Sequence, residues 1–71
     1  METITITTEY IRLQDLMKLS NMVSSGGEAK QLIQDGQVLV NGEPCLQRGR
    51  KLRPGDEVSY SGRTCTPAYA S

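Results

Sequence analysis

The chain contains no histidine, tryptophan or phenylalanine, and its aromatic side chains are three tyrosines. Histidine is the usual general base beside a catalytic serine or cysteine, so nucleophile pairs of that kind are excluded. The carboxylates are mostly spread singly along the chain and form no recognisable acid–base pair. We therefore expect no enzymatic activity and no cofactor.

The scarcity of aromatic residues also bears on nucleic-acid binding. A stacking platform for single-stranded bases usually needs two or three aligned aromatic side chains. The tyrosines here are Tyr10, Tyr60 and Tyr69, and Tyr60 is expected in the core on a strand face. This composition argues against binding of extended single-stranded RNA by base stacking, and any RNA contact would rely on the shape and backbone charge of a folded RNA.

Only two cysteines, Cys45 and Cys65, are present, which makes a zinc site built from cysteine and histidine improbable. The N-terminus lacks a basic region followed by an apolar run, so no secretory signal is recognised. No stretch approaches the roughly 20 apolar residues of a membrane span. We expect a cytoplasmic protein with free cysteines, no metal and no membrane contact.

Two periodic segments open the chain, whose 71 residues allow one domain with a small core. Residues 3–7 alternate threonine with isoleucine, which predicts a short half-buried strand. Apolar side chains then recur at helical spacing and predict a helix over about residues 13–21. Its buried stripe comprises Leu13, Leu16, Met17 and Ser20.

A second helix is marked at both ends. Ser25, followed three residues later by Glu28, matches a capping box. Gly36 suits the left-handed position that ends a helix. Because residues 22–24 alone separate the two helices, they should pack as a helical hairpin. The buried stripe of the second helix comprises Ala29, Leu32 and Ile33.

The apolar period then changes to two. Val38 and Val40 share one face, and Asn41-Gly42 predicts a type I′ hairpin, in which both central residues need positive φ. This turn places Val40 opposite Glu43. Pro44 indicates that the second strand of the hairpin lies at a sheet edge.

The end of the chain is predicted to be less ordered. Pro54-Gly55 fits the centre of a type II turn. Val58 and Tyr60 then alternate on what is expected to be the last strand. Little apolar content follows, so we expect residues 1–61 to form the domain and residues 62–71 to form a flexible tail.

Charge is balanced over the whole chain but not locally. Eight basic and eight acidic residues give a formal net charge of zero. Four of the basic residues lie in residues 48–53, called the basic segment below: Arg48, Arg50, Lys51 and Arg53. Such a charge run is usually solvated surface, which is the alternative interpretation. A tight loop would crowd these cations, however, and a bound anion would relieve their repulsion. Since the planar fork of arginine suits phosphate, we interpret the segment as a polyanion contact.

Further candidates lie on the predicted helices. Lys18 and Lys30 avoid the apolar stripes, and ordinary solubility explains them unless both face the side of the basic segment. Gly26-Gly27 would expose backbone N–H groups at a helix start, where phosphate can bind. Close helix packing explains these glycines equally well. No Gly-Lys-Ser/Thr follows them, so they are not part of a nucleotide-binding P-loop.

Four short motifs, each weak alone, follow one another along the chain: Leu13-x-x-Leu16, Ala29-Lys30-x-Leu32-Ile33-x-x-Gly36, Val38-x-Val40-Asn41-Gly42 and Pro54-Gly55-Asp56-x-Val58. In this order and spacing they resemble the small RNA-binding domain of ribosomal protein S-four, also called the αL motif. The likeness covers about residues 10–60. The glycine-rich helix start and the basic segment look most like the short stand-alone bacterial members, the YaaA-like and YbcJ-like proteins.

The resemblance implies an α+β fold in which a two-helix hairpin packs on a small, bent antiparallel sheet. It also implies non-catalytic binding of structured RNA, ribosomal or transfer RNA, with ribosomal particles or another RNA-associated protein as further partners. By position, Lys30 matches a basic residue of the second helix that faces RNA in this family. Arg12 matches a basic position at the start of the first helix. Many relatives have one more basic residue where this chain has Gly26-Gly27-Glu28. The helical face of this chain is therefore less positively charged, and we expect the basic segment to make more of the RNA contact.

The neutral net charge keeps a second hypothesis open, a protein-interaction adaptor with the same fold and little RNA affinity. Capture of partners that resists nuclease would favour the adaptor. We expect a ribosome-associated monomer. The residues predicted to contact RNA are Arg12, Lys18, Lys30, Arg48, Arg50, Lys51 and Arg53, with Gly26 and Gly27 as a candidate phosphate seat.

Overall fold

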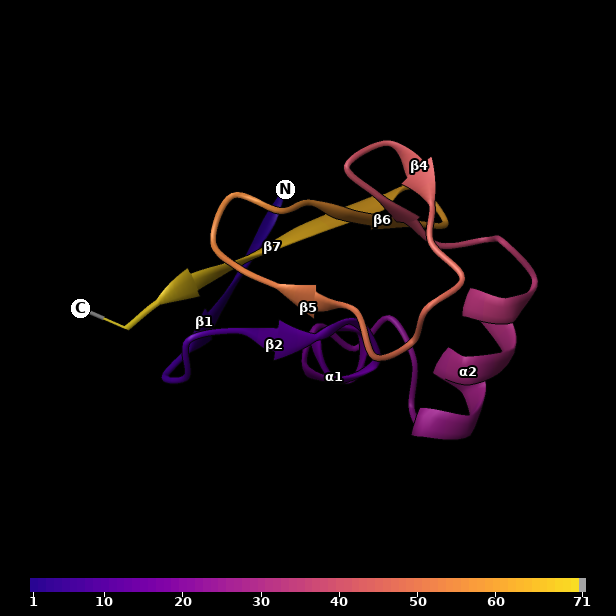
Figure 1. Ribbon diagram of the computed structural model, residues 1–71, viewed down its shortest axis with the longest axis horizontal. Helices are drawn as coiled ribbons and strands as arrows, with labels where there is room; N and C mark the ends of the chain where they lie inside the picture. Colours follow the sequence, from indigo (N-terminus) through magenta and orange to yellow (C-terminus); the bar gives the residue numbers. More distant parts are fainter. Residues whose placement is uncertain (71) are drawn as a thin grey trace.

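The computed structural model describes residues 1–70, in which two helices lie on one side of a five-stranded sheet (Figure 1). The helices are α1 (Leu13–Leu19) and α2 (Gly26–Gln34). The strands are β1 (Glu2–Ile6), β2 (Ile11–Arg12), β3 (Leu39–Val40), β4 (Glu43–Pro44), β5 (Lys51–Leu52), β6 (Val58–Tyr60) and β7 (Arg63–Tyr69). The expected α+β class with a two-helix hairpin is therefore confirmed.

The larger sheet has the strand order β1-β7-β6-β3-β4. Its β1 and β7 run parallel, whereas the other neighbouring strands run antiparallel. The sheet is thus mixed, not wholly antiparallel as expected, because the first and last strands of the described chain lie side by side. β2 and β5 form a separate antiparallel ladder, and β2 leads directly into α1 (Figure 1).

The C-terminal segment belongs to the sheet, so the prediction of a flexible tail over residues 62–71 is wrong for residues 63–69. β7 pairs with β1 from Cys65 to Tyr69 and with β6 from Arg63 to Cys65. Pro67 is buried in this strand. Beyond Cys65, β7 has no strand partner on the side of β6. Pro67, which has no backbone N–H to donate, therefore interrupts no ladder on that side. Residue 71, also predicted as tail, lies outside the described residues.

Two hairpins share the same two-residue turn geometry. The φ angles of Asn41-Gly42 are 53° and 86°, and those of Ser61-Gly62 are 51° and 81°. Positive φ at both positions is characteristic of type I′ turns. In the first hairpin Val40 lies opposite Glu43, and the exposed Pro44 lies on the edge strand β4, as predicted. The second hairpin joins β6 to β7 and was not predicted.

The helix ends follow local backbone chemistry. α1 ends at Leu19, two residues earlier than predicted, and Asn21 just after it has a left-handed φ of 61°. In α2 the Ser25 Oγ accepts the Glu28 N–H at 3.2 Å, which confirms the Ser25 half of the predicted capping box, while the Glu28 carboxylate accepts the Ser24 hydroxyl. Gly36, with φ 74°, follows the C-terminal end of α2 as predicted.

One hydrophobic core joins helices and strands. Its members are Ile6, Ile11, Leu13, Leu16, Met17, Met22, Val23, Ala29, Ile33, Val38, Val40, Cys45, Leu52, Val58 and Cys65. Met17 and Met22 fill the core as expected, and both cysteines are free and buried. Neither helix in the described part of the chain has the length and apolar character to cross a membrane.

Candidate functional site

The basic segment runs past the start of α1 with one side chain in the core. Its Lys51 and Leu52 form β5, where they lie opposite Arg12 and Ile11 of β2. Leu52 is 0% exposed, whereas all four basic residues of the segment are exposed. Alternation along a short strand therefore anchors the segment through leucine and leaves its cations in solvent.

Backbone hydrogen bonds fix the basic segment to α1. The N–H of Leu13 donates to the Arg50 carbonyl at 2.9 Å, and the N–H of Gln14 donates to the Arg48 carbonyl at 3.1 Å. The first amides of a helix have no acceptor inside the helix. Arg12, at the cap position, makes no side-chain capping bond. The carbonyls of the basic segment take that role and bring two of its arginines to the helix start beside Arg12.

The cations of this region lie close together. Arg12 and Lys51 occupy directly opposite positions on β2 and β5, an arrangement that disfavours two like charges. The Lys51 Nζ lies 4.9 Å from the centre of the Tyr10 ring, a cation–π contact that leaves the charge in place. Among residues 1–70, the ion pairs within 4.0 Å involve other basic residues. The basic segment and Arg12 thus form an exposed cluster without a carboxylate partner.

Asp56 fixes the exit from the basic segment. Its carboxylate accepts the Arg53 backbone N–H at 2.9 Å and the Asn41 side-chain amide at 3.0 Å. The Asp56 N–H donates to the Arg53 carbonyl at 3.0 Å across a turn in which Gly55 has φ 103°, as a type II turn requires. The hydrogen bonds from Arg53 and Asn41, in that order, lower the pKa of Asp56, and the nearby charges of Arg50 and Arg53 lower it further. The carboxylate bonds the backbone of Arg53, which leaves the exposed guanidinium outside this contact.

The two helical lysines differ in their surroundings. Lys18 Nζ lies 3.5 Å from Asp15, which precedes it on α1. Lys30 is exposed on α2, whose buried side chains include Ala29 and Ile33. The ion pairs of residues 1–70 link neither lysine to the basic segment. Their place in a common surface therefore stays a prediction.

The start of α2 offers open backbone at Gly26-Gly27. A Cβ built on Gly26 would meet no atom within 4 Å, and one on Gly27 would meet the Ser25 Oγ at 4.0 Å. Close helix packing therefore does not explain these glycines. The Glu28 carboxylate also lies at this end, where it accepts the Ser24 hydroxyl at 3.2 Å. An anionic side chain already complements the helix dipole here, and the phosphate seat stays a prediction.

Arg63 is the basic residue that the sequence did not single out. Its guanidinium donates to both carboxylate oxygens of Glu2, at 2.9 and 2.7 Å. It also donates to the carbonyls of Ser20, at 2.6 Å, and Asn21, at 3.2 Å. The hydrogen bond from Arg63 lowers the pKa of Glu2, and the same bond raises that of Arg63. Arg63 thus joins β7, β1 and the C-terminal end of α1 and is part of the fold.

The signal for this strand was present in the sequence. Ser-Gly is a turn dipeptide, and Arg63 follows it directly. Beyond it the buried Cys65 and Pro67 alternate with half-buried neighbours, as period two requires. Burial raises the pKa of the Cys65 thiol, so the thiol stays protonated and is a poor nucleophile.

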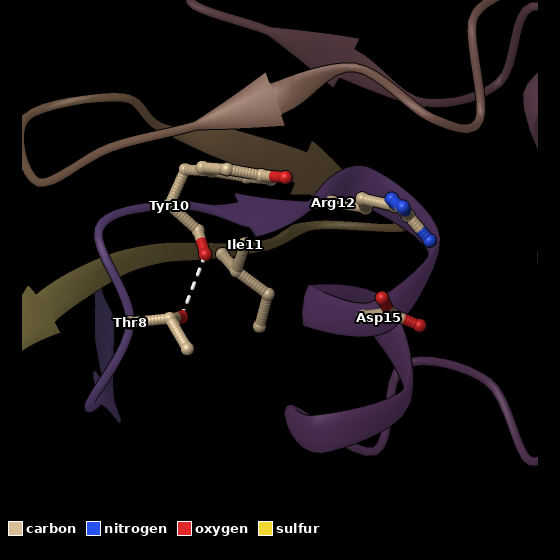
Figure 2. Close-up of a pocket in the computed structure, with 5 residues that line it drawn as sticks. All are labelled: Thr8, Tyr10, Ile11, Arg12 and Asp15. Atoms are coloured by element: carbon tan, nitrogen blue, oxygen red, sulfur yellow. Dashed lines mark hydrogen bonds between the residues drawn. The ribbon is translucent and has the colours of Figure 1, made fainter.

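A hollow with a volume of about 390 Å³ opens beside β2. Figure 2 shows its lining: the Tyr10 ring is seen edge-on above Ile11, with Thr8 on one side and Arg12 and Asp15 on the other. The Thr8 Oγ1 donates to the Tyr10 carbonyl at 2.7 Å and fixes the chain where it enters β2 (Figure 2). Because Arg12 also lies opposite Lys51, the hollow adjoins the basic segment.

Comparison with known proteins agrees with this architecture. The family model described as "S4 domain" matches residues 4–66, which is most of the chain. The chain belongs to the S4 domain family. This S4 domain is 48% identical over 59 residues to the probable ribosome maturation protein RlbA of Bacillus subtilis (strain 168), covering 83% of each chain. It is 36% identical over 55 residues to YbcJ of Escherichia coli (strain K12), covering 78% of this chain and 79% of YbcJ.

A solved structure supports the same fold for this S4 domain. The solution structure of YbcJ from E. coli, described as having an αL motif involved in RNA binding, superposes with a TM-score of 0.71 at 32% sequence identity. The similarity covers 96% of this chain and 87% of YbcJ. The resemblance found in the sequence, including the YbcJ-like subgroup, is thereby confirmed. Because the match reaches residue 66 and the structural likeness nearly the whole chain, β7 is included in the shared architecture.

Proposed function

We propose that this protein binds structured RNA without catalysing a reaction, and that the basic segment supplies the main phosphate contacts. Arg12 lies beside the segment, and Lys18 and Lys30 contribute from the helices. The observation that carries the proposal is the exposed cluster of cations at the start of α1. Its backbone is held by two hydrogen bonds to that helix, while its side chains have no carboxylate partner among residues 1–70.

Rigidity of the backbone matters for this function. A phosphate contact loses less entropy when the loop that bears the cations is already ordered. The buried Leu52, the caps at Leu13 and Gln14, and the Asp56 turn all restrain the basic segment before RNA arrives. Shape and backbone charge of a folded RNA are then sufficient for recognition, as the small number of aromatic residues indicated.

The relatives favour ribosomal RNA over transfer RNA as the target. RlbA, at 48% identity, is named for ribosome maturation, and YbcJ is described by its RNA-binding motif. By similarity, we propose that this protein contacts ribosomal RNA or a ribosomal particle in the cytoplasm. Transfer RNA is the comparison ligand that tests this preference.

The experiment is a titration of purified bacterial ribosomal RNA and transfer RNA at several salt concentrations. If about four phosphates are neutralised, log K should fall with log salt with a slope of about −3 to −4. In the variant Arg50→Gln/Lys51→Gln, the slope should fall in magnitude by about 2. Ribosomal RNA is expected to bind more tightly than transfer RNA at the same salt.

A matched control separates local from overall charge. Thr3→Glu/Thr5→Glu makes the same change in net charge on the exposed face of β1, in the sheet that does not contain β5. This control should keep most of the native affinity. Equal RNA binding by the native protein and Arg50→Gln/Lys51→Gln would contradict the assignment of the basic segment. Capture of a protein partner that resists nuclease, without RNA binding, would instead support the adaptor hypothesis.

A further inference from the structure

We infer that the hollow beside β2 receives one unpaired base of an RNA held by the basic segment. The inference rests on the proposed RNA binding and adds a base-stacking site to it. Its occupant is a nucleotide that protrudes from a folded RNA, as in a bulge or loop. The site consists of Tyr10 with Thr8, Ile11, Arg12 and Asp15 around it.

The Tyr10 ring is placed for stacking. Its ring turns toward the hollow above Ile11 (Figure 2). Lys51, which lies over the ring at 4.9 Å, is not among the residues that line the hollow. The ammonium therefore does not occupy the hollow. A base entering the hollow can contact the ring while the cation–π contact persists, and unpaired RNA bases commonly stack on such rings.

The walls of the hollow are ordered before any ligand binds. Thr8 holds the Tyr10 carbonyl, and the Tyr69 hydroxyl donates to the Glu9 carbonyl at 3.0 Å, next to Tyr10 in the chain. Ile11, which is 9% exposed, joins the hydrophobic core. The volume of the hollow, about 390 Å³, lies within the roughly 300–1,000 Å³ of typical small-ligand sites.

Charge at the rim identifies the occupant as a nucleotide. Arg12 lines the hollow and lies opposite Lys51, so a planar aromatic group in the hollow would have cations beside it for its phosphate. The Asp15 carboxylate offers an acceptor to the amino group of a base, and its pairing with Lys18 at 3.5 Å offsets its repulsion of the RNA backbone. An apolar wall, an aromatic ring and a cationic rim together match the base and the phosphate of one nucleotide.

The site has room for a single base stacked on protein. Of the other two tyrosines, Tyr60 packs against the hydrophobic core, and neither it nor Tyr69 lines the hollow. Extended single-stranded RNA would need further aromatic residues along its path. We therefore expect preference for a duplex with one protruding nucleotide over a fully paired duplex.

The experiment uses two RNA hairpins that differ at one position. In the first, 2-aminopurine occupies a one-nucleotide bulge, and in the second the same nucleotide is paired. The native protein should bind both hairpins through the basic segment, but the bulged one about 5- to 10-fold more tightly, since stacking on an aromatic side chain contributes roughly that factor or more. Binding should also quench the 2-aminopurine fluorescence of the bulged hairpin only.

Three variants separate the base site from the phosphate contact. Tyr10→Leu should lose the preference and the quenching yet still bind the paired hairpin, while Tyr10→Phe should retain both. Arg48→Gln/Arg50→Gln should weaken binding of the two hairpins equally. Independently of any substitution, the NMR signals of the native Tyr10 ring should shift with the bulged hairpin and not with the paired one.

The outcomes distinguish the two proposals. Equal affinity of the native protein for both hairpins, with unchanged fluorescence and Tyr10 signals, would overturn the base site and leave RNA binding intact. A preference that persists in a folded Tyr10→Leu variant would also overturn it. Failure of the native protein to bind either hairpin at low salt would overturn the proposed RNA binding, and the base site with it.

Discussion

Arg63 and the arginines of the basic segment differ in what surrounds the guanidinium group. Arg63 donates to both carboxylate oxygens of Glu2 and to two main-chain carbonyls at the end of α1. The arginines of the basic segment are exposed and have no carboxylate within 4.0 Å among residues 1–70. Arg63 thus stabilises the fold through its hydrogen bonds, whereas the arginines of the basic segment remain available to bind an anion.

The comparison explains how a chain with zero net charge can carry a cationic site. Net charge sums paired and unpaired groups alike, whereas a ligand responds to the local field. Here Glu2 takes up the charge of Arg63. Asp56 lies nearest the basic segment in sequence, but it accepts hydrogen bonds from a backbone N–H and an asparagine side chain. The overall balance of charges therefore does not cancel the local excess.

The largest expected effect comes from removing the core anchor of the basic segment. Leu52 is 0% exposed, so Leu52→Ala should cost about 2–5 kcal/mol of unfolding free energy. That is a large part of the roughly 4–10 kcal/mol expected for a chain of this length. Because the basic segment caps α1, thermal unfolding should show loss of the whole domain in one transition.

A matched leucine provides the control. Leu46, which precedes the basic segment, is 63% exposed, and Leu46→Ala should change stability by less than about 0.5 kcal/mol. If Leu52→Ala melted like the native protein, the basic segment would not be anchored as described. RNA binding by Leu52→Ala should fall by more than the unfolded fraction at the assay temperature, because the basic segment of the folded variant has lost its anchor and is less ordered before binding.

Local signals made much of this architecture predictable. The Ser25 cap, the Asn41-Gly42 turn and the apolar stripes of both helices depend on residues that are close in sequence. β7 was missed because its parallel partner, β1, lies at the other end of the chain, and because Pro67 is tolerated only where β6 has ended. The parallel pairing in the sheet was missed for the same reason.

The candidate site was predictable only in part. The exposed cations of the basic segment are evident from the sequence, and their exposure is confirmed. The capping of α1 by the Arg48 and Arg50 carbonyls involves main-chain atoms, which carry no residue-specific signal. The hollow at Tyr10 requires the chain before β2 to lie against the start of α1, a contact that periodicity does not reveal.

A second prediction compares the removal of the Arg63 side chain with the removal of the Arg50 side chain. Arg63→Ala should lower the melting temperature by several degrees, because it leaves the Glu2 carboxylate and the Ser20 and Asn21 carbonyls without their shared donor. Arg50→Ala, at an exposed position, should leave the melting temperature almost unchanged and weaken RNA binding. Arg63→Lys should fall between native and Arg63→Ala, since an ammonium cannot reproduce the bidentate fork.

Melting temperature and RNA affinity together distinguish a structural arginine from one that binds RNA. Calorimetry gives the melting temperatures, and an RNA titration at fixed low salt gives the affinities of the folded variants. If Arg63→Ala lost RNA affinity as strongly as Arg50→Ala while remaining folded, Arg63 would belong to the binding surface. A large loss of stability in Arg50→Ala would show that its side chain, and not only its carbonyl, supports α1.

The smallest expected effect concerns the two carboxylates whose pKa values the fold lowers. Glu2 is stabilised chiefly by the side chain of Arg63, and Asp56 chiefly by the backbone N–H of Arg53. A folded-state pKa below the unfolded value means that the stabilisation is present above the unfolded pKa. It is lost as the pH falls through the folded value. Stability should therefore be constant near neutral pH and decline as the pH falls below the ordinary pKa values of 4.5 for Glu2 and 3.8 for Asp56.

The variant Asp56→Asn separates the turn from the ion pair. At pH 7 it should cost about 1 kcal/mol, since a neutral amide replaces a carboxylate that accepts two hydrogen bonds. This cost should vanish on acidification, because protonation removes the same charge from the native protein. RNA affinity should rise slightly, since a negative charge near Arg50 and Arg53 is gone. Urea titrations from pH 2.5 to 7 measure the effect, with Glu57→Gln as a neighbouring control. A stability difference that stayed constant over this range would mean that Asp56 acts through shape alone. The negative charge of Asp56 would then contribute nothing to holding the basic segment in place.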